Sequence, residues 1–233
     1  MNKKKLLVVI PARGGSKRIP QKNIKKIGNQ PIIAWPLKTL FKIFKKKQII
    51  VSTDNIKIKR ICENYGLTIP FLRPKNISGD KTGTMEVVNH ALNWFEKNFF
   101  PIDYVLIVYP TAIFLKEKDL KLAIKKIEKE KNCSCIFSAT SFIHPIQRAF
   151  YLNSKNNVKM FNPKFKNTRS QDVKKSFHDV GQFYLCKSSV IRKKKNLLNS
   201  NSKIIVLPRY RSIDIDTFED LNYAKKILKI SKF

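Results

Sequence analysis

Acidic residues are scarce in this chain of 233 residues, which holds 16 Asp and Glu against 48 Lys and Arg, for a formal net charge of +32. Such an imbalance is typical of proteins that bind nucleic acids. Here, however, 39 of the 48 cations are lysines scattered over nearly every segment, and no zinc-finger, RNA-recognition or basic-helix signature accompanies them. We therefore expect a densely charged surface and no nucleic-acid partner.

Long hydrophobic runs are absent as well. The longest spans six residues, whereas a membrane-spanning helix needs about 20. The basic first residues look like the flank of a signal peptide, but the five-residue apolar run at 6–10 is shorter than a signal peptide requires and stops at Pro11. We expect a cytoplasmic protein with no membrane insertion.

Cysteine is also sparse, with four residues and no CxxC pair. Cys133 and Cys135 alternate as they would in a buried strand, and no histidine lies nearby to complete a zinc site. We interpret the cysteines as reduced thiols of the core. Hydrophobic residues at 42% and aromatic residues at 11% are enough to form that core.

The hydrophobic pattern alternates between short apolar runs and amphipathic segments. Strands are predicted at 6–10, 48–53, 104–109, 133–140, 182–186 and 203–207. Helices are predicted at 31–44, 55–65, 84–97, 116–130 and 217–228, with Pro36 implying a kink or a late start in the first of them. Alternating strands and helices predict one α/β domain over residues 1–233 with a largely parallel sheet.

Residues 141–180 interrupt this alternation. Two prolines, an Asn156-Asn157 turn and the lack of a helical period predict an inserted hairpin arm. We expect the arm to cover a site or to build an interface.

A loop rich in glycine and basic residues follows the first strand, where open α/β sheets bind ligands. Gly14 and Gly15 would let backbone N–H groups approach a phosphate, and Arg13, Lys17, Arg18 and Lys22 would supply charge. The spacing matches neither a Walker A loop nor a GxGxxG fingerprint. A basic surface loop with a glycine turn remains the alternative.

Asp214 and Asp216 form the second candidate site. In an extended segment, side chains at i and i+2 point the same way, so the two carboxylates could share a Mg²⁺ ion. The alternative is that Asp216 caps the last helix while Asp214 is solvated. Together with the basic loop, the pair suggests metal-dependent nucleotidyl transfer.

The motifs at 10–23, 51–54, 71–74 and 214–217 resemble those of the cytidylyltransferases that activate sialic acid and Kdo. The segments at 145–149, 167–172, 178–184 and 207–211 are similar to the pseudaminic acid branch in particular. The resemblance implies a Rossmann-like nucleotidyltransferase fold, a three-layer sandwich with a mostly parallel sheet and a small inserted arm. Tyr109 stands where the sialic acid enzymes carry Gln, which favours the pseudaminic branch, whereas Pro110, Ile113 and Val180 depart from that branch's usual Ala, Pro and Ala.

The same resemblance implies roles for individual residues. Arg13, Lys22 and Asp216 would be catalytic; Arg13, Gly14, Ser16 and Lys22 would hold the triphosphate; Asn23, Arg73 and Thr84 would contact cytidine; and Asp214 and Asp216 would bind Mg²⁺. The sugar would lie near Tyr109, Gln147, Arg169, Gln171, His178, Asp179 and Gln182, of which His178 is equally compatible with a structural role.

The implied reaction is CTP + pseudaminic acid → CMP-pseudaminic acid + pyrophosphate, through in-line attack of the sugar's anomeric hydroxyl on the α-phosphorus. Its product would be a sugar donor for glycosylation of flagellin or surface glycans, and we expect a homodimer. Legionaminic, sialic or Kdo-like acids are alternative substrates, and a basic nucleic-acid-binding protein is the non-enzyme alternative.

Overall fold

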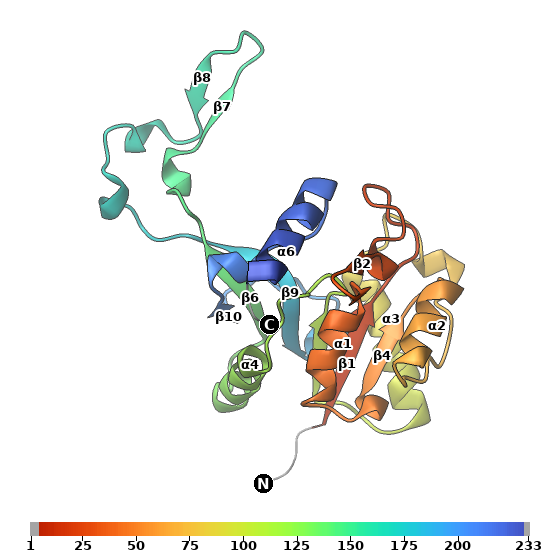
Figure 1. Ribbon diagram of the computed structural model, residues 1–233. Coiled ribbons are helices and arrows are strands. Elements are labelled where there is room, and N and C mark those ends of the chain that lie inside the picture. The colour runs from red at the N-terminus through yellow and green to blue at the C-terminus, as the bar shows by residue number, and fades with distance from the viewer. Residues whose placement is uncertain (1–4, 231–233) are drawn as a thin grey trace.

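A computed structural model describes residues 5–230 of the chain. Its main sheet has the strand order β10-β6-β9-β5-β1-β4 (Figure 1). These strands are β1 (Leu6–Pro11), β4 (Ile49–Ser52), β5 (Tyr104–Val108), β6 (Cys135–Ser141), β9 (Phe177–Lys187) and β10 (Ser202–Val206). The helices are α1 (Ala34–Phe41), α2 (Ile56–Asn64), α3 (Thr84–Asn98), α4 (Glu117–Lys129), α5 (Ser188–Arg192) and α6 (Phe218–Ile230).

Short elements complete the fold. Two hairpins are formed by β2 (Lys26–Ile27) with β3 (Gln30–Pro31) and by β7 (Phe150–Leu152) with β8 (Val158–Met160). Single 3-10 turns occupy Lys22–Ile24, Lys46–Gln48, Lys75–Ile77, Ile146–Arg148, Pro163–Phe165, Ser170–Asp172 and Arg209–Arg211.

The sheet is mostly parallel, which confirms the expected α/β fold. β1 pairs in parallel with β4 and β5, and β10 pairs in parallel with β6. β9 is the exception, since it runs antiparallel to both of its neighbours, β5 and β6. Because of that direction, the beginning of β9 lies at the same edge of the sheet as the ends of β5 and β6.

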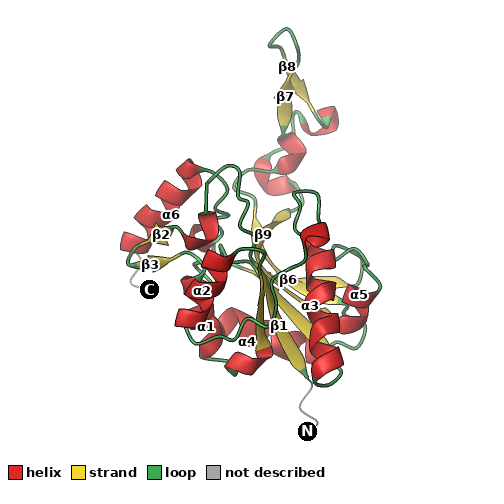
Figure 2. Ribbon diagram, turned by 90° about the vertical axis from the view of Figure 1, so that its right-hand side faces the viewer, coloured by secondary structure: helices red, strands yellow, loops and turns green. Residues whose placement is uncertain are grey.

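Helices cover both faces of the sheet, giving three layers (Figure 2). Successive residues of β1 face opposite sides, as a strand requires. Val8 and Ile10 belong to the core shared with α1, α2 and α4, whereas Leu7 and Val9 belong to the core shared with α3 and α5. Burial on both faces explains why these strands consist of continuous apolar runs.

A third apolar cluster joins α6 to the loop after β1. Ile213 and Ile215 pack with Ile19 of that loop and with Leu221 and Ala224 of α6. This cluster packs the segment before α6, which carries Asp214 and Asp216, against the loop after β1.

The first helix begins later than predicted. Residues 31–44 were expected to be helical, but α1 spans Ala34–Phe41, and Gln30–Pro31 instead forms β3. Pro36 is then the third residue of the helix. A proline in the first turn is tolerated because the amide hydrogens there have no carbonyl partner within the helix.

The segment in which we expect an arm, 141–180, carries the β7–β8 hairpin, which projects from the body (Figures 1 and 2). The predicted boundary with the sheet was wrong by several residues. β9 already begins at Phe177, where Phe177, His178 and Asp179 pair with β6 beyond a break in register between Phe137 and Ala139. The first residues of β9 are polar and partly exposed, so a search for apolar runs in the sequence does not detect them as part of a strand.

The four cysteines are free and buried. Cys135 and Cys186 face each other across β6 and β9, with 2.7 Å between their Sγ atoms. Within the described residues, no helix is long and apolar enough to cross a membrane.

Candidate active site

A cleft of about 550 Å³ opens where the loop after β1 meets the C-terminal end of β5 and the segment before α6. Its walls include Arg13, Ser16, Lys17, Arg18, Lys22, Asn23, Arg73, Asp80, Thr82, Thr84, Tyr109, Thr111 and Asp216. The cleft therefore brings together all of the expected triphosphate and cytidine residues except Gly14, and one of the two expected metal ligands.

Four cations of the loop are held by two carboxylates. Arg13 Nη1 lies 2.6 Å from Asp80 Oδ1, and Lys17 pairs with the other oxygen of Asp80. Lys22 Nζ lies 3.0 Å from Asp216 Oδ1, and Arg18 Nη2 lies 2.7 Å from Asp216 Oδ2. A site with this concentration of donors and charge is suited to a polyphosphate.

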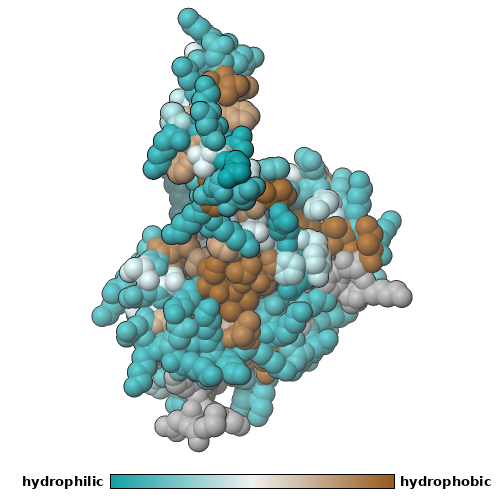
Figure 3. All heavy atoms as spheres, turned by 90° about the vertical axis from the view of Figure 1, so that its left-hand side faces the viewer, coloured by the Kyte–Doolittle hydropathy of each residue, from teal (hydrophilic) through white to brown (hydrophobic). Residues whose placement is uncertain are grey.

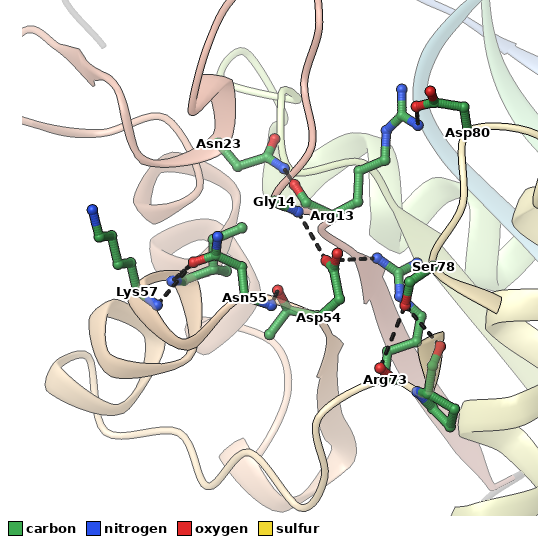
Figure 4. Close-up of polar contacts among 12 residues, drawn as sticks. Arg13, Gly14, Asn23, Asp54, Asn55, Lys57, Arg73, Ser78 and Asp80 are labelled. Carbon is green, nitrogen blue, oxygen red and sulfur yellow. Dashed lines mark hydrogen bonds and ion pairs between the residues drawn. The ribbon is translucent and has the colours of Figure 1, made fainter. Parts of the chain in front are cut away.

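Gly14 is placed differently from the expectation that it faces a phosphate. A Cβ atom at this position would lie 2.5 Å from Asn55 Nδ2, so glycine is required for the loop to pack against the start of α2. Its N–H is donated to Asp54 at 2.8 Å (Figure 4). Gly14 shapes the loop, while the charged side chains around it face the cleft.

Asp214 and Asp216 alternate with the buried Ile213 and Ile215, and of the two carboxylates only Asp216 lines the cleft. Partial burial alone would raise the pKa of Asp216. The hydrogen bond and charge of Lys22, together with Arg18, outweigh burial, so the pKa of Asp216 is lowered. Asp214 behaves in the opposite way. Burial and the neighbouring charge of Asp216 raise the pKa of Asp214 although its side chain retains contact with solvent.

This donor set suits a divalent cation that is shared with a substrate. The carboxylate of Asp214 makes no hydrogen bond or ion pair with any described residue, and burial, with the neighbouring charge of Asp216, raises its pKa. The described residues contain no group of three or more His, Cys, Asp or Glu side chains placed to hold a metal ion. Mg²⁺ commonly takes only one or two protein carboxylates and completes its shell with water and phosphate oxygens.

Helix α6 starts just after the carboxylate pair, and Asp216 is not its cap. Thr217 Oγ1 accepts the N–H of Asp220 at 3.2 Å, and Asp220 Oδ2 accepts the N–H of Thr217 at 2.7 Å. This reciprocal arrangement satisfies the first turn of the helix. Asp216 is therefore available for cations.

The residues expected to contact cytidine also line the cleft. Asn23 is buried and donates Nδ2 to the carbonyl of Arg13 at 2.9 Å, leaving its Oδ1 without a partner. The side chain of Arg73 is 4% exposed, and its Nε also lacks a partner. Both are buried polar atoms without a partner, which a hydrogen-bonding ligand in the cleft would satisfy.

Thr84 and Tyr109 form a pair in the cleft, with 3.1 Å between the two hydroxyl oxygens. Burial is the main cause that raises the pKa of Tyr109, and the charges of Asp179 and Asp214 add to it. Tyr109 thus contacts Thr84 and lies close enough to Asp179 and Asp214 to be affected by their charges.

Three of the expected sugar residues lie on β9 at the edge of the sheet, outside the walls of the cleft. Asp179 accepts the N–H of Gly181 at 2.8 Å and the hydroxyl of Tyr184, and burial raises its pKa. Gln182 is buried and donates to the carbonyl of Arg211. His178 Nδ1 lies 2.9 Å from the carbonyl oxygen of Asp179.

The other three expected sugar residues lie on the arm, and none lines the cleft. Gln147 donates to the carbonyl of Lys174 at 2.8 Å, and Arg169 pairs with Asp172 through a 2.9 Å contact while remaining 75% exposed. Gln171 belongs to the same 3-10 turn as Asp172. Within a single chain, these three arm residues therefore do not reach the cleft.

Sequence reasoning assigned no role to Asp54 or Asp80, although each contacts the basic loop. The sequence holds only 16 acidic residues, and this scarcity was the one signal that could have marked these two carboxylates as candidates. Arg211, from the segment at 207–211, does not line the cleft; it is buried and paired with Asp119.

Comparison with known proteins agrees with this geometry. The family model described as cytidylyltransferase matches residues 7–232. A pseudaminic acid cytidylyltransferase of Campylobacter jejuni strain 81-176 is 38% identical over 97% of each chain. A CMP-N,N'-diacetyllegionaminic acid synthase of Legionella pneumophila is 27% identical over 98% of each chain.

Among solved structures, a CMP:2-keto-3-deoxy-manno-octonic acid synthetase complexed with CTP superposes with a TM-score of 0.71. It covers 97% of this chain and 99% of its own, with 14% identity. A 4-diphosphocytidyl-2C-methyl-D-erythritol synthase of Anaerococcus prevotii superposes with a TM-score of 0.66, covering 97% of this chain and 96% of its own at 16% identity. The shared fold is that of nucleotidyltransferases.

Proposed function

Since the chain belongs to the cytidylyltransferase family, we propose that it transfers CMP from CTP to pseudaminic acid and releases pyrophosphate. The observation that carries the proposal is the meeting of a basic loop and the Asp216 carboxylate in one cleft, with Lys22 Nζ 3.0 Å from Asp216 Oδ1. Phosphoryl and nucleotidyl transfer depend on positioning and charge neutralisation more than on a protein nucleophile.

The reaction requires no covalent enzyme intermediate. The anomeric hydroxyl oxygen forms a bond to the α-phosphorus, the bond from that phosphorus to the bridging oxygen breaks, and pyrophosphate leaves with the electron pair. The hydroxyl proton passes to solvent. Arg13, Ser16 and Lys22 would bind the triphosphate, and Lys22 would oppose the negative charge that develops on pyrophosphate.

Asp214 and Asp216 would hold Mg²⁺ in this proposal. The ion would supply positive charge to phosphate oxygens of CTP. Asp216 now pairs with Lys22 and Arg18, so a cation bound at Asp216 would free both side chains for the triphosphate.

Asn23, Arg73 and Thr84 would contact cytidine, using the unpaired Asn23 Oδ1 and Arg73 Nε. Tyr109, His178, Asp179 and Gln182 would lie on the sugar side. The product would serve as a sugar donor for glycosylation of flagellin or surface glycans.

A homodimer is part of the proposal. Large apolar side chains of the arm are exposed, including Phe150 at 61%, Val158 at 61% and Phe161 at 70%. Apolar residues also gather on the face of the body below the arm (Figure 3). Exposed apolar patches of this kind are typical of interfaces, and a second copy would give Gln147, Arg169 and Gln171 a surface to contact.

Replacing Asp216 by Asn tests the site. The amide keeps the side chain's shape but removes the charge that would bind the metal, so pyrophosphate release supported by Mg²⁺ should fall by at least about tenfold, or ~1.4 kcal/mol in barrier. Glu219→Gln, an exposed change on α6, serves as the matched control and should retain activity. An Asp216→Asn protein that kept more than about a tenth of the wild-type rate would show that the carboxylate is structural.

A further inference from the structure

Asp54 lies just after β4, at the edge of the sheet where the basic loop begins. The chain is tightly fixed here. Thr53 Oγ1 accepts the N–H of Asn55 at 3.2 Å, and Asn55 caps α2 by accepting the N–H groups of Lys57 and Ile58 at 2.8 and 3.3 Å. Asp54 is therefore presented from a rigid strand-to-helix turn.

One oxygen of Asp54 joins two segments that are distant in sequence. Oδ1 accepts the backbone N–H of Gly14 at 2.8 Å and lies 3.4 Å from Nη2 of Arg73 (Figure 4). Gly14 belongs to the triphosphate loop and Arg73 to the residues expected to contact cytidine. A charged acceptor makes shorter and stronger hydrogen bonds than a neutral one.

Neighbouring contacts make the spacing of these two segments specific. The carbonyl of Arg13 is held by Asn23 on one side, and the next N–H is held by Asp54 on the other. The backbone N–H of Arg73 is donated to the carbonyl of Thr53 at 2.7 Å. Loop, turn and Arg73 thus share one hydrogen-bonded frame.

Charge gives Asp54 a second task in this frame. Burial lowers the pKa of Arg73, Asp54 counteracts this effect, and the nearby charge of Arg13 lowers the pKa further. Without Asp54, Arg13 would keep its ion pair with Asp80, but the buried guanidinium of Arg73 would have no anion beside it. The side chain of Arg73 would lose the hydrogen bond and the ion pair that hold it in position.

We propose that Asp54 is a positioning residue that sets the spacing between the triphosphate loop and Arg73, so that the cleft selects a nucleoside triphosphate over free polyphosphate. This inference rests on the proposed function, because it takes Arg73 to be a base or ribose contact. Asp54 itself would touch neither the reacting phosphorus nor the sugar.

Two substitutions separate the two bonds of Asp54. Asp54→Asn keeps an oxygen that can accept the Gly14 N–H but removes the negative charge beside Arg73. Asp54→Ala removes both interactions. Glu63→Gln on α2, which loses only a surface pair with Lys59, is the matched control.

The experiment measures the Kd of CTP and of tripolyphosphate by calorimetry, with Mg²⁺ present, for the full-length wild-type chain and the three variants, alongside their Tm. Asp54→Asn should weaken CTP binding by about tenfold and leave tripolyphosphate within about threefold of wild type. Asp54→Ala should weaken both ligands. Glu63→Gln should match wild type.

Equal losses for both ligands in Asp54→Asn, or no loss of CTP affinity at an unchanged Tm, would overturn the positioning role. If Asp54→Ala were unfolded, the Asp54→Asn comparison would still decide the question. A wild-type protein that bound tripolyphosphate but not CTP would defeat the proposed function, and with it the selection assigned to Asp54.

Discussion

The segment that carries Asp214 and Asp216 is anchored by a buried ion pair between Arg211 and Asp119. Arg211 Nη1 lies 2.6 Å from Asp119 Oδ2, Nη2 lies 3.3 Å from Oδ1, and the two side chains are 4% and 10% exposed. Arg211→Met would leave the Asp119 carboxylate buried without a counter-ion. Such a change costs about 3–5 kcal/mol, and at about 2–4 °C per kcal/mol for a chain of this size the Tm should fall by roughly 6–20 °C.

Thermal unfolding followed by circular dichroism measures this effect. Arg211→Met combined with Asp119→Leu removes both charges, so it should recover most of the lost stability, because the cost arises from the unpaired carboxylate. A Tm within about 3 °C of wild type for the single variant, or no recovery in the double variant, would refute the anchoring role of the pair.

Three further predictions concern the cleft and the core. Lys22→Met should lower kcat/KM for CTP by about a hundredfold with Tm unchanged. Steady-state kinetics in which the KM for the sugar acid rose by the same factor would contradict this prediction. Because Asp80 pairs with Arg13 and Lys17, a triphosphate must compete with its carboxylate, and Asp80→Asn should tighten CTP binding about threefold in calorimetry, whereas weaker binding would make Asp80 a supporting group. Burial raises the pKa of Cys62 to about 12, so a thiol reagent at pH 8 should label the cysteines only after unfolding, and rapid labelling of the native protein would count against their burial.

Much of the fold was predictable because burial on both faces leaves a strong pattern. The run at 6–10 and the run at 104–109 became β1 and β5 almost unchanged. β9 was harder, since its first residues are polar and pair with β6 outside the apolar core. The late start of α1 followed from Pro36, but the β2–β3 hairpin before it comprises only four paired residues and carries no alternating pattern.

The candidate site was predictable to the extent that charge and spacing marked it. The alternation of Asp214 and Asp216 with Ile213 and Ile215 is visible in the sequence, and the structure buries both isoleucines and places Asp216 in the cleft. The role of Gly14 was not predictable, because its contact with Asn55 depends on how β4 returns beside β1. For the same reason, nothing in the sequence showed that Asp54 and Arg73 would meet.

The most direct test of the account is to incubate the purified protein with CTP and Mg²⁺, supply pseudaminic, legionaminic, sialic and Kdo acids in parallel, and measure pyrophosphate release. We expect pyrophosphate with pseudaminic acid and CTP, at a rate at least tenfold above that with any other acid, and none when CTP or the sugar acid is omitted. A clear preference for one of the other acids would contradict the assigned substrate, and no pyrophosphate with any of them would contradict the proposed reaction.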